Sequence, residues 1–100
     1  MVVPPPIGDV AVVASDTLRP GDWVEVVVKS APEHYASMDV SRTIADVPLY
    51  EEEPGLYRGF YRVNRGDKIA GPVTVHVSDR FGVASSRVLR EHPLSTEEKR

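Results

Sequence analysis

The stretch GLYRGFYRV, residues 55–63, decides the fold because its apolar side chains occupy both faces of a single extended segment. In a strand, successive side chains point to opposite faces. One face holds every second residue from the first tyrosine on: Tyr57, Gly59, Tyr61 and Val63. The other face holds the residues between them: Leu56, Arg58, Phe60 and Arg62. We expect the tyrosine face to be the core side, since each buried aromatic ring removes about 150–250 Å² from water.

The same period of two residues recurs on both sides of this stretch. Three other segments place apolar side chains on an expected inner face: Val24, Val26 and Val28; Ala36, Met38 and Val40; Val73, Val75 and Val77. Further strands are expected near residues 9–14, 46–51 and 83–89. Short clusters of glycine, proline and aspartate separate these segments, and such residues favour turns. The pattern predicts an all-β fold, an immunoglobulin-like sandwich of about seven antiparallel strands in two sheets.

Composition supports this fold class and excludes several functions. Among 100 residues there are 17 valines, and β-branched side chains favour strands. The net charge of −3 argues against a nucleic-acid partner and against an anionic membrane surface, because both require basic residues. Without cysteine the chain has no disulfide, thiolate metal site or cysteine nucleophile. No apolar run approaches the roughly 20 residues of a membrane-spanning helix.

The chain divides into three parts by composition. Residues 1–7, MVVPPPI, are expected to be a proline-rich linker, because consecutive prolines favour an extended polyproline conformation. Residues 8–91 contain the predicted sandwich, and residues 92–100 are polar and charged, which is typical of a tail or linker. A domain between two linkers indicates a piece of a longer protein. If that protein is exported, its signal lies outside this piece.

Four stretches resemble the bacterial immunoglobulin-like and fibronectin-type-III-like modules of secreted and cell-envelope proteins. They are LRPGDWVEVVVKS, YASMDV, VPLYEEEPGLYRGFYRV and GPVTVHVSDRFGVAS. The resemblance covers roughly residues 9–90 and implies an accessory module with an extracellular or cell-envelope location. The chain lacks the two bridging cysteines of antibody-type domains, so their tryptophan packed on a disulfide has no counterpart. Trp23 falls on the face opposite the valines.

A group of acidic residues is a candidate cation site. Glu51, Glu52 and Glu53 lie close to Asp46, and calcium prefers several oxygen ligands. The ordered acidic spacing of a dedicated calcium loop is absent, and we expect a charged turn that keeps a sheet edge soluble. The expectation is no metal and no cofactor. Other aspartates at strand ends are expected to bond their own turn backbones: Asp16, Asp22, Asp67 and Asp79.

Histidine and serine residues are the catalytic candidates in this sequence. His34, His76 and His92 lie on different segments and show no spacing of metal ligands. His76 shares a predicted outer face with Ser78, but no nucleophile elbow accompanies them. We therefore expect no enzymatic activity. Residues 64–67, NRGD, contain the tripeptide of integrin ligands, and a hairpin turn accounts for them equally well.

Exposed aromatic residues are the best candidate binding residues. If Trp23, Tyr35 and Phe60 lie on one outer surface, they form a patch flanked by Arg58 and Arg62. The alternative is that the arginine stems cover the rings. The expected function is a non-catalytic spacer or interaction module that docks neighbouring domains or another protein. The alternative function is a carbohydrate-binding module, whose rings would be coplanar and exposed to a polysaccharide.

Overall fold

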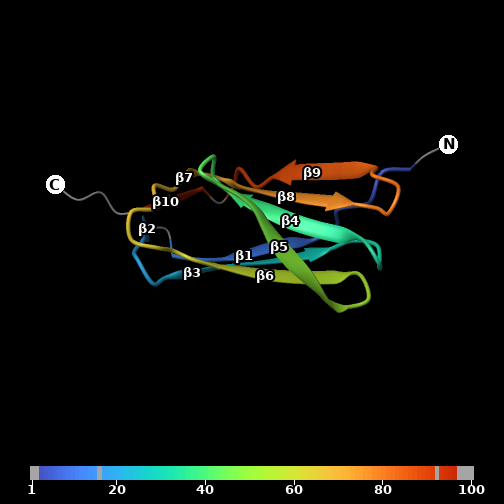
Figure 1. The fold of residues 1–100 in the computed structure, drawn as a ribbon, viewed down its shortest axis with the longest axis horizontal. Helices are drawn as coiled ribbons and strands as arrows, with labels where there is room; N and C mark the ends of the chain where they lie inside the picture. The colour runs from blue at the N-terminus through green and yellow to red at the C-terminus, as the bar shows by residue number, and fades with distance from the viewer. Residues whose placement is uncertain (1–2, 16, 92, 97–100) are drawn as a thin grey trace.

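The computed structural model describes residues 3–15, 17–91 and 93–96 and confirms the all-β class (Figure 1). The described residues form ten strands: β1 Val10–Val13, β2 Thr17–Leu18, β3 Trp23–Lys29, β4 Tyr35–Val40, β5 Ile44–Glu53, β6 Leu56–Arg62, β7 Ala70–Gly71, β8 Val73–Ser78, β9 Ala84–Val88 and β10 Leu94–Thr96. Seven of them correspond to the predicted strands. β2, β7 and β10 were not predicted.

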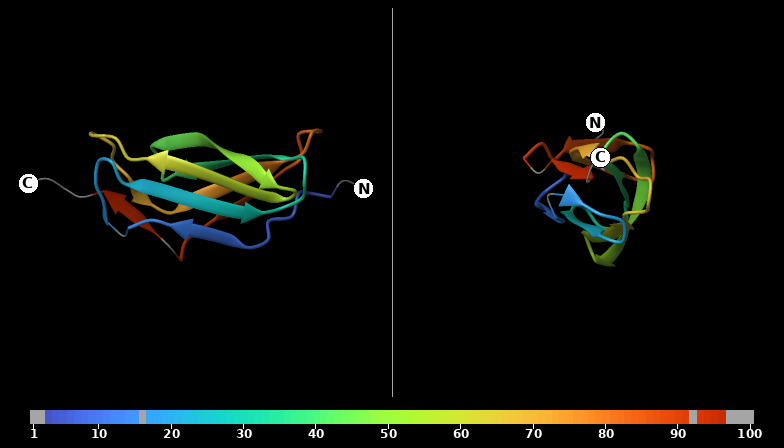
Figure 2. Two further views of the ribbon diagram at one scale, coloured as in Figure 1. Left: turned by 90° about the horizontal axis from the view of Figure 1, so that it is seen from below. Right: turned by 90° about the vertical axis from the view of Figure 1, so that its left-hand side faces the viewer.

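The seven predicted strands form one antiparallel sheet in the order β1-β3-β6-β5-β4-β8-β9. Seen along the long axis of the molecule, this sheet curls around a central space (Figure 2). The predicted inner faces fill that space, and the inward valines of β3 and β8 are fully buried. Tyr57 is 1% exposed, so the tyrosine face of residues 55–63 is the core side as expected. Tyr61, on the same face, is half-buried.

Strand β5 joins the two halves of the curled sheet. Its first part pairs with β4, including Leu49 with Ala36, and its last part pairs with β6, including Tyr50 with Arg58. The register shifts between Glu51 and Glu53, and such bulges bend a strand. β5 passes very close to Gly59 of β6. A β-carbon placed on Gly59 would lie 2.2 Å from a methyl carbon of Leu49 and 2.8 Å from the carbonyl oxygen of Pro48.

The short strands form a second sheet in the order β2-β10-β7. β10 pairs in parallel with β2 and antiparallel with β7. Leu18 of β2 and Leu94 of β10 are buried in the core. Residues 94–96 lie within the segment 92–100 that we expected to be a tail or linker, and the burial of Leu94 explains why they are ordered as a strand. Residues 92 and 97–100 lie outside the described part of the chain.

The end of the proline-rich segment packs on the domain. Pro5 is buried, and Ile7 packs against the core. The hydroxyl of Ser30 donates to the carbonyl of Pro6 at 2.6 Å. The guanidinium of Arg87 on β9 donates to the carbonyls of Ile7 and Gly8, just before β1. Arg87 therefore ties together the two edge strands, β1 and β9, that the curled sheet leaves unpaired with each other.

The first and last described residues leave the fold at opposite ends. The principal extents are 53 × 23 × 20 Å. The chain before β1 lies at the end that carries the β8–β9 hairpin, whereas β10 lies at the other end (Figures 1 and 2). The strands run roughly along the long axis between these ends.

Candidate functional site: the outer aromatic face

Trp23 and Phe60 lie together on the outer side of β3 and β6. Trp23 pairs with Arg62, and Phe60 pairs with Glu25, so the two rings occupy adjacent rows. Their centroids are 6.2 Å apart and their planes meet at 86°, an edge-to-face contact. Trp23 is 55% exposed and Phe60 is 53% exposed. The guanidinium carbon of Arg62 lies 5.8 Å from the centroid of the Trp23 ring, within the range of a cation–π interaction.

Tyr35 does not belong to this group. It begins β4 and pairs with Ser78 of β8, and β5 lies between β4 and β6. The structure instead adds two residues that we had not considered, Tyr50 of β5 and Val13 of β1, which are 69% and 60% exposed. The alternation of buried Leu49 with exposed Tyr50 is the sequence signal that places Tyr50 outward. We refer to Val13, Trp23, Tyr50 and Phe60 as the outer aromatic face.

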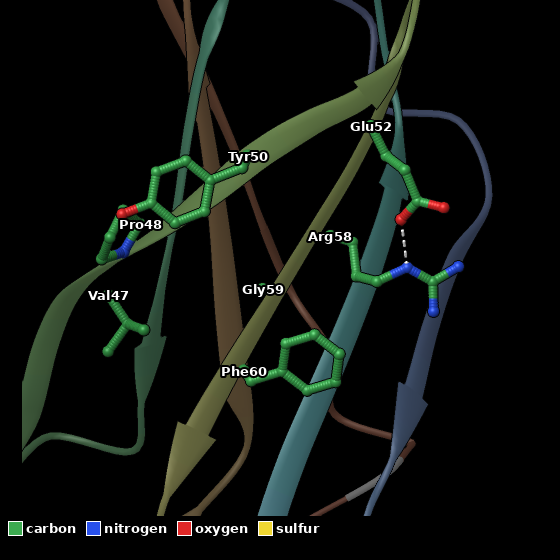
Figure 3. A pocket seen from close by; sticks show the side chains of 7 residues that line it. All are labelled: Val47, Pro48, Tyr50, Glu52, Arg58, Gly59 and Phe60. Carbon is green, nitrogen blue, oxygen red and sulfur yellow. Dashed lines mark hydrogen bonds and ion pairs between the residues drawn. The ribbon is translucent and has the colours of Figure 1, made fainter.

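Phe60 separates two apolar hollows on this face. One hollow, of about 490 Å³, lies between the rings of Tyr50 and Phe60 and is lined by Val47, Pro48, Tyr50, Glu52, Arg58, Gly59 and Phe60 (Figure 3). The other hollow, also of about 490 Å³, is lined by Val13, Trp23, Glu25 and Phe60. A protruding ring with an apolar depression on either side is suited to receive apolar groups of a partner.

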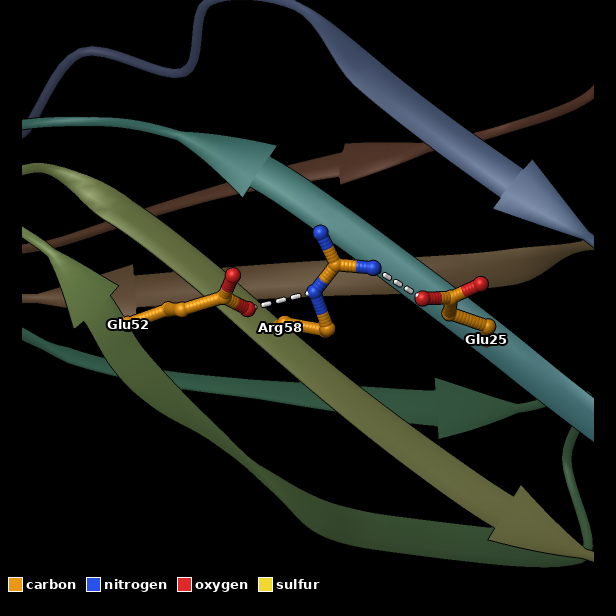
Figure 4. A network of polar contacts seen from close by, with 3 residues as sticks. All are labelled: Glu25, Glu52 and Arg58. Carbon is orange, nitrogen blue, oxygen red and sulfur yellow. Dashed lines mark hydrogen bonds and ion pairs between the residues drawn. The ribbon is translucent and has the colours of Figure 1, made fainter.

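A charged cluster lies beside the rings. Arg58 donates through Nε to Glu52 at 2.5 Å and through Nη1 to Glu25, so one guanidinium bridges carboxylates from β3 and β5 (Figure 4). Both hydrogen bonds raise the pKa of Arg58 above its usual value, and the bond to Glu52 has the larger effect. Two carboxylates and one guanidinium leave the cluster with a formal charge of −1. Arg58 is thus held along the sheet and does not cover the Phe60 ring.

A second polar group lies on the outer side of β4, β8 and β9. One ring nitrogen of His76 lies 2.9 Å from Asp39, and the other lies 2.6 Å from the hydroxyl of Ser86. The serine hydrogen-bonded to His76 is therefore Ser86, not the Ser78 that the sequence pattern suggested. None of these three residues lines either hollow. Their arrangement crosslinks three neighbouring strands.

The pKa of Asp39 makes stability depend on pH in acid. Burial favours the neutral acid, but hydrogen bonds from the backbone N–H of Asp46 and from His76 outweigh it and lower the pKa below 3.8. The ionised Asp39 therefore contributes to the free energy of unfolding above pH 3.8, and this contribution is lost as pH falls through the folded-state pKa. In urea titrations, Asp39→Asn should lose less stability than the wild type when the pH falls from about 5 to about 2.

The control for this prediction is Asp9→Asn, which changes an exposed carboxylate before β1. The change in acid dependence caused by Asp39→Asn should be larger than the change caused by this control. Equal acid dependence in Asp39→Asn and the wild type would contradict the prediction.

Several of the acidic residues considered in the sequence stabilise turns through hydrogen bonds. Glu51 accepts hydrogen bonds from the backbone N–H groups of Gly55 and Glu33. Both bonds lower the pKa of Glu51, and the bond from Gly55 has the larger effect. Asp67, in the NRGD turn, accepts from the hydroxyl of Tyr61 at 2.5 Å and from the N–H of Asn64 at 2.8 Å. These bonds account for the acidic turn and the NRGD loop as structural features.

Two further aspartates have the predicted turn role. Asp22 accepts from the N–H of Arg19, and Asp79 accepts from the N–H groups of Phe81 and Val83. Asp16 and His92 lie outside the described residues. Within residues 3–15, 17–91 and 93–96, no group of three or more histidine, cysteine, aspartate or glutamate side chains is placed to hold a metal ion.

Comparisons with known proteins found no relative. No protein-family model matches the chain, and no curated protein or solved structure matches it. In the described part of the chain, no helix has the length and apolar character needed to cross a membrane.

Proposed function

We propose that the chain is a non-catalytic spacer and interaction module of a larger bacterial extracellular or cell-envelope protein. The observation that carries the proposal is the placement of the chain ends. The described chain enters at one end of an elongated body and reaches β10 at the other. A domain built this way extends a multidomain protein and separates its neighbours.

The anchoring of both ends supports this role. Residues 6–8 are tied to Ser30, Lys29 and Arg87 by hydrogen bonds, and the N–H of Thr96 donates to the carbonyl of Ile69. A neighbour attached at either end would therefore connect to a fixed point of the fold. If the attachment were flexible, the distance between the neighbouring domains would not be fixed.

The finer fold assignment and the location belong to the same proposal. We propose that the halves of the curled sheet on either side of β5 act as the two layers of an immunoglobulin-like or fibronectin-type-III-like sandwich. The pairing of β5 with both β4 and β6 supports this description, because one strand passes from one half to the other. The extracellular or cell-envelope location follows from the sequence resemblance to such modules.

Single-molecule energy transfer tests the spacer. The chain is placed between two fluorescent domains, and the control carries 100 residues of Gly/Ser linker in its place. The control should have a root-mean-square length of about 50–60 Å with a broad distribution. The chain has a similar length of 53 Å, so the test depends on the width of the distribution of distances between the two fluorescent domains. We expect a narrow distribution that broadens only at unfolding. A distribution as broad as that of the control would contradict the proposal.

Carbohydrate binding is the second candidate, and the exposure of Trp23 and Phe60 favours it. The angle of 86° between these rings does not give the coplanar platform that we expected for stacked sugars. A sugar stacked on the side of the Trp23 ring that faces Arg62 would also have to displace the guanidinium. These two features favour a protein partner at this face.

A further inference from the structure

We propose that the outer aromatic face binds the same face of a second copy of this chain, with the two copies related by a two-fold axis. This inference goes beyond the spacer role and does not depend on it. It would place two modules side by side, with their outer β3–β6–β5 surfaces in contact.

The shape of the face is complementary to itself. A two-fold interface needs a projection and a matching depression on the same surface, because residue i of one copy meets residue j of the other and the reverse. Phe60 is the projection, and the hollow between Phe60 and Tyr50 is the depression beside it. An axis between the Phe60 ring and this hollow places each Phe60 in the hollow of the other copy.

The charges are also complementary under this operation. On β6, Arg58 and Arg62 lie two residues to either side of Phe60, about 7 Å along the strand in each direction. For two faces in contact the two-fold axis lies in the plane of the interface, and an axis that crosses β6 at right angles near Phe60 exchanges these two positions. Arg62 of one copy then lies over the Glu25–Arg58–Glu52 cluster of the other, whose formal charge is −1. Each contact brings a cation to a cluster in which two carboxylates outweigh one guanidinium, and the symmetry provides the contact twice.

The residues of the face also match the composition of interface cores. Trp, Tyr, Phe and Arg are enriched in such surfaces, and Trp, Tyr and Arg are the residues that most often dominate affinity. A standard interface buries about 800 Å² from each partner, or about one eighth of the 6688 Å² surface of this chain. Other exposed rings lie apart from the face: Tyr35 begins β4, and Phe81 lies in the β8–β9 hairpin.

Sedimentation velocity of the full chain over a range of concentrations tests the proposal. We expect a reversible dimer with a Kd of about 1–100 µM. Phe60→Ser should raise the Kd at least about tenfold, because it removes the central ring of the interface. Arg62→Glu should also raise the Kd, since it brings a third carboxylate to the acidic cluster. The matched control is Phe81→Ser, which removes another exposed ring and should leave the Kd unchanged.

Thermal melting monitors the fold of each variant. Phe60, Arg62 and Phe81 are exposed, so the variants should melt close to the wild type. A wild type that remains monomeric at about 1 mM would overturn the proposal. A dimer that Phe60→Ser leaves intact would overturn it as well, because another face would then mediate association. A monomer whose Trp23 fluorescence shifts to the blue with a polysaccharide would assign the face to sugar instead.

Discussion

Replacing Tyr57 by alanine is expected to lower the free energy of unfolding by about 3–5 kcal/mol, the usual cost of removing a large buried ring. Tyr57 is 1% exposed and belongs to the core. Its hydroxyl donates to the carbonyl of Ala31 at 2.7 Å and accepts from the N–H of His34 at 2.9 Å. The ring therefore fills the core while its hydroxyl fixes the segment between β3 and β4. Urea unfolding followed by circular dichroism measures the change.

A second variant separates the two contributions of Tyr57. Tyr57→Phe keeps the ring and removes the hydroxyl, so it should cost about 1–3 kcal/mol for the two backbone groups left without this partner. Tyr50→Phe is the control, because it removes a hydroxyl from an exposed ring and should have little effect. If Tyr57→Phe were as stable as the wild type, the hydroxyl would have no role in the stability of this segment.

Replacing Gly59 by alanine is expected to lower the free energy of unfolding by about 1–3 kcal/mol or more, as overpacking does. The added β-carbon would lie 2.8 Å from the carbonyl oxygen of Pro48, and backbone yields less readily than the end of a side chain. It would also collide with Leu49, so β5 would have to move away from β6. Urea unfolding again gives the change.

Gly8→Ala is the matched control for Gly59→Ala. A β-carbon at Gly8 would come no closer than 3.4 Å to its nearest neighbour, the carbonyl oxygen of Lys29, so the change should be small. Equal stabilities of the Gly8 and Gly59 variants would show that the close approach of β5 and β6 is easily relaxed.

The alternation of side chains predicted more of the fold than of the site. It placed all seven strands of the large sheet and the inner faces of β3, β4, β6 and β8, because burial on one face imposes a period of two. It missed β2, β7 and β10, which are two or three residues long. Their pairing joins residues far apart in sequence, as Thr17 with Ser95, and no local pattern records such a contact.

The site was predicted only as far as single strands could show it. The alternation of side chains correctly predicted that Trp23 and Phe60 face outward. The pairing of β3 with β6 brings the two rings together. It could not show that β5 separates Tyr35 from them, because the order of strands in a sheet is not a local property. The partners of His76 depend in the same way on the register of β8 with β4 and β9. The position of Tyr35 and the partners of His76 become visible only when the strand order and register are known.

The parallel pairing of β2 with β10 determines how the fold would carry mechanical load. A pull on the two ends draws the early part of the chain toward one end of the molecule and β10 toward the other. The hydrogen bonds between β2 and β10 lie across this direction, so tension shears them together and does not open them one by one. Tension along the long axis would therefore load two contacts of the fold, the pairing of β1 with β3 and the pairing of β2 with β10.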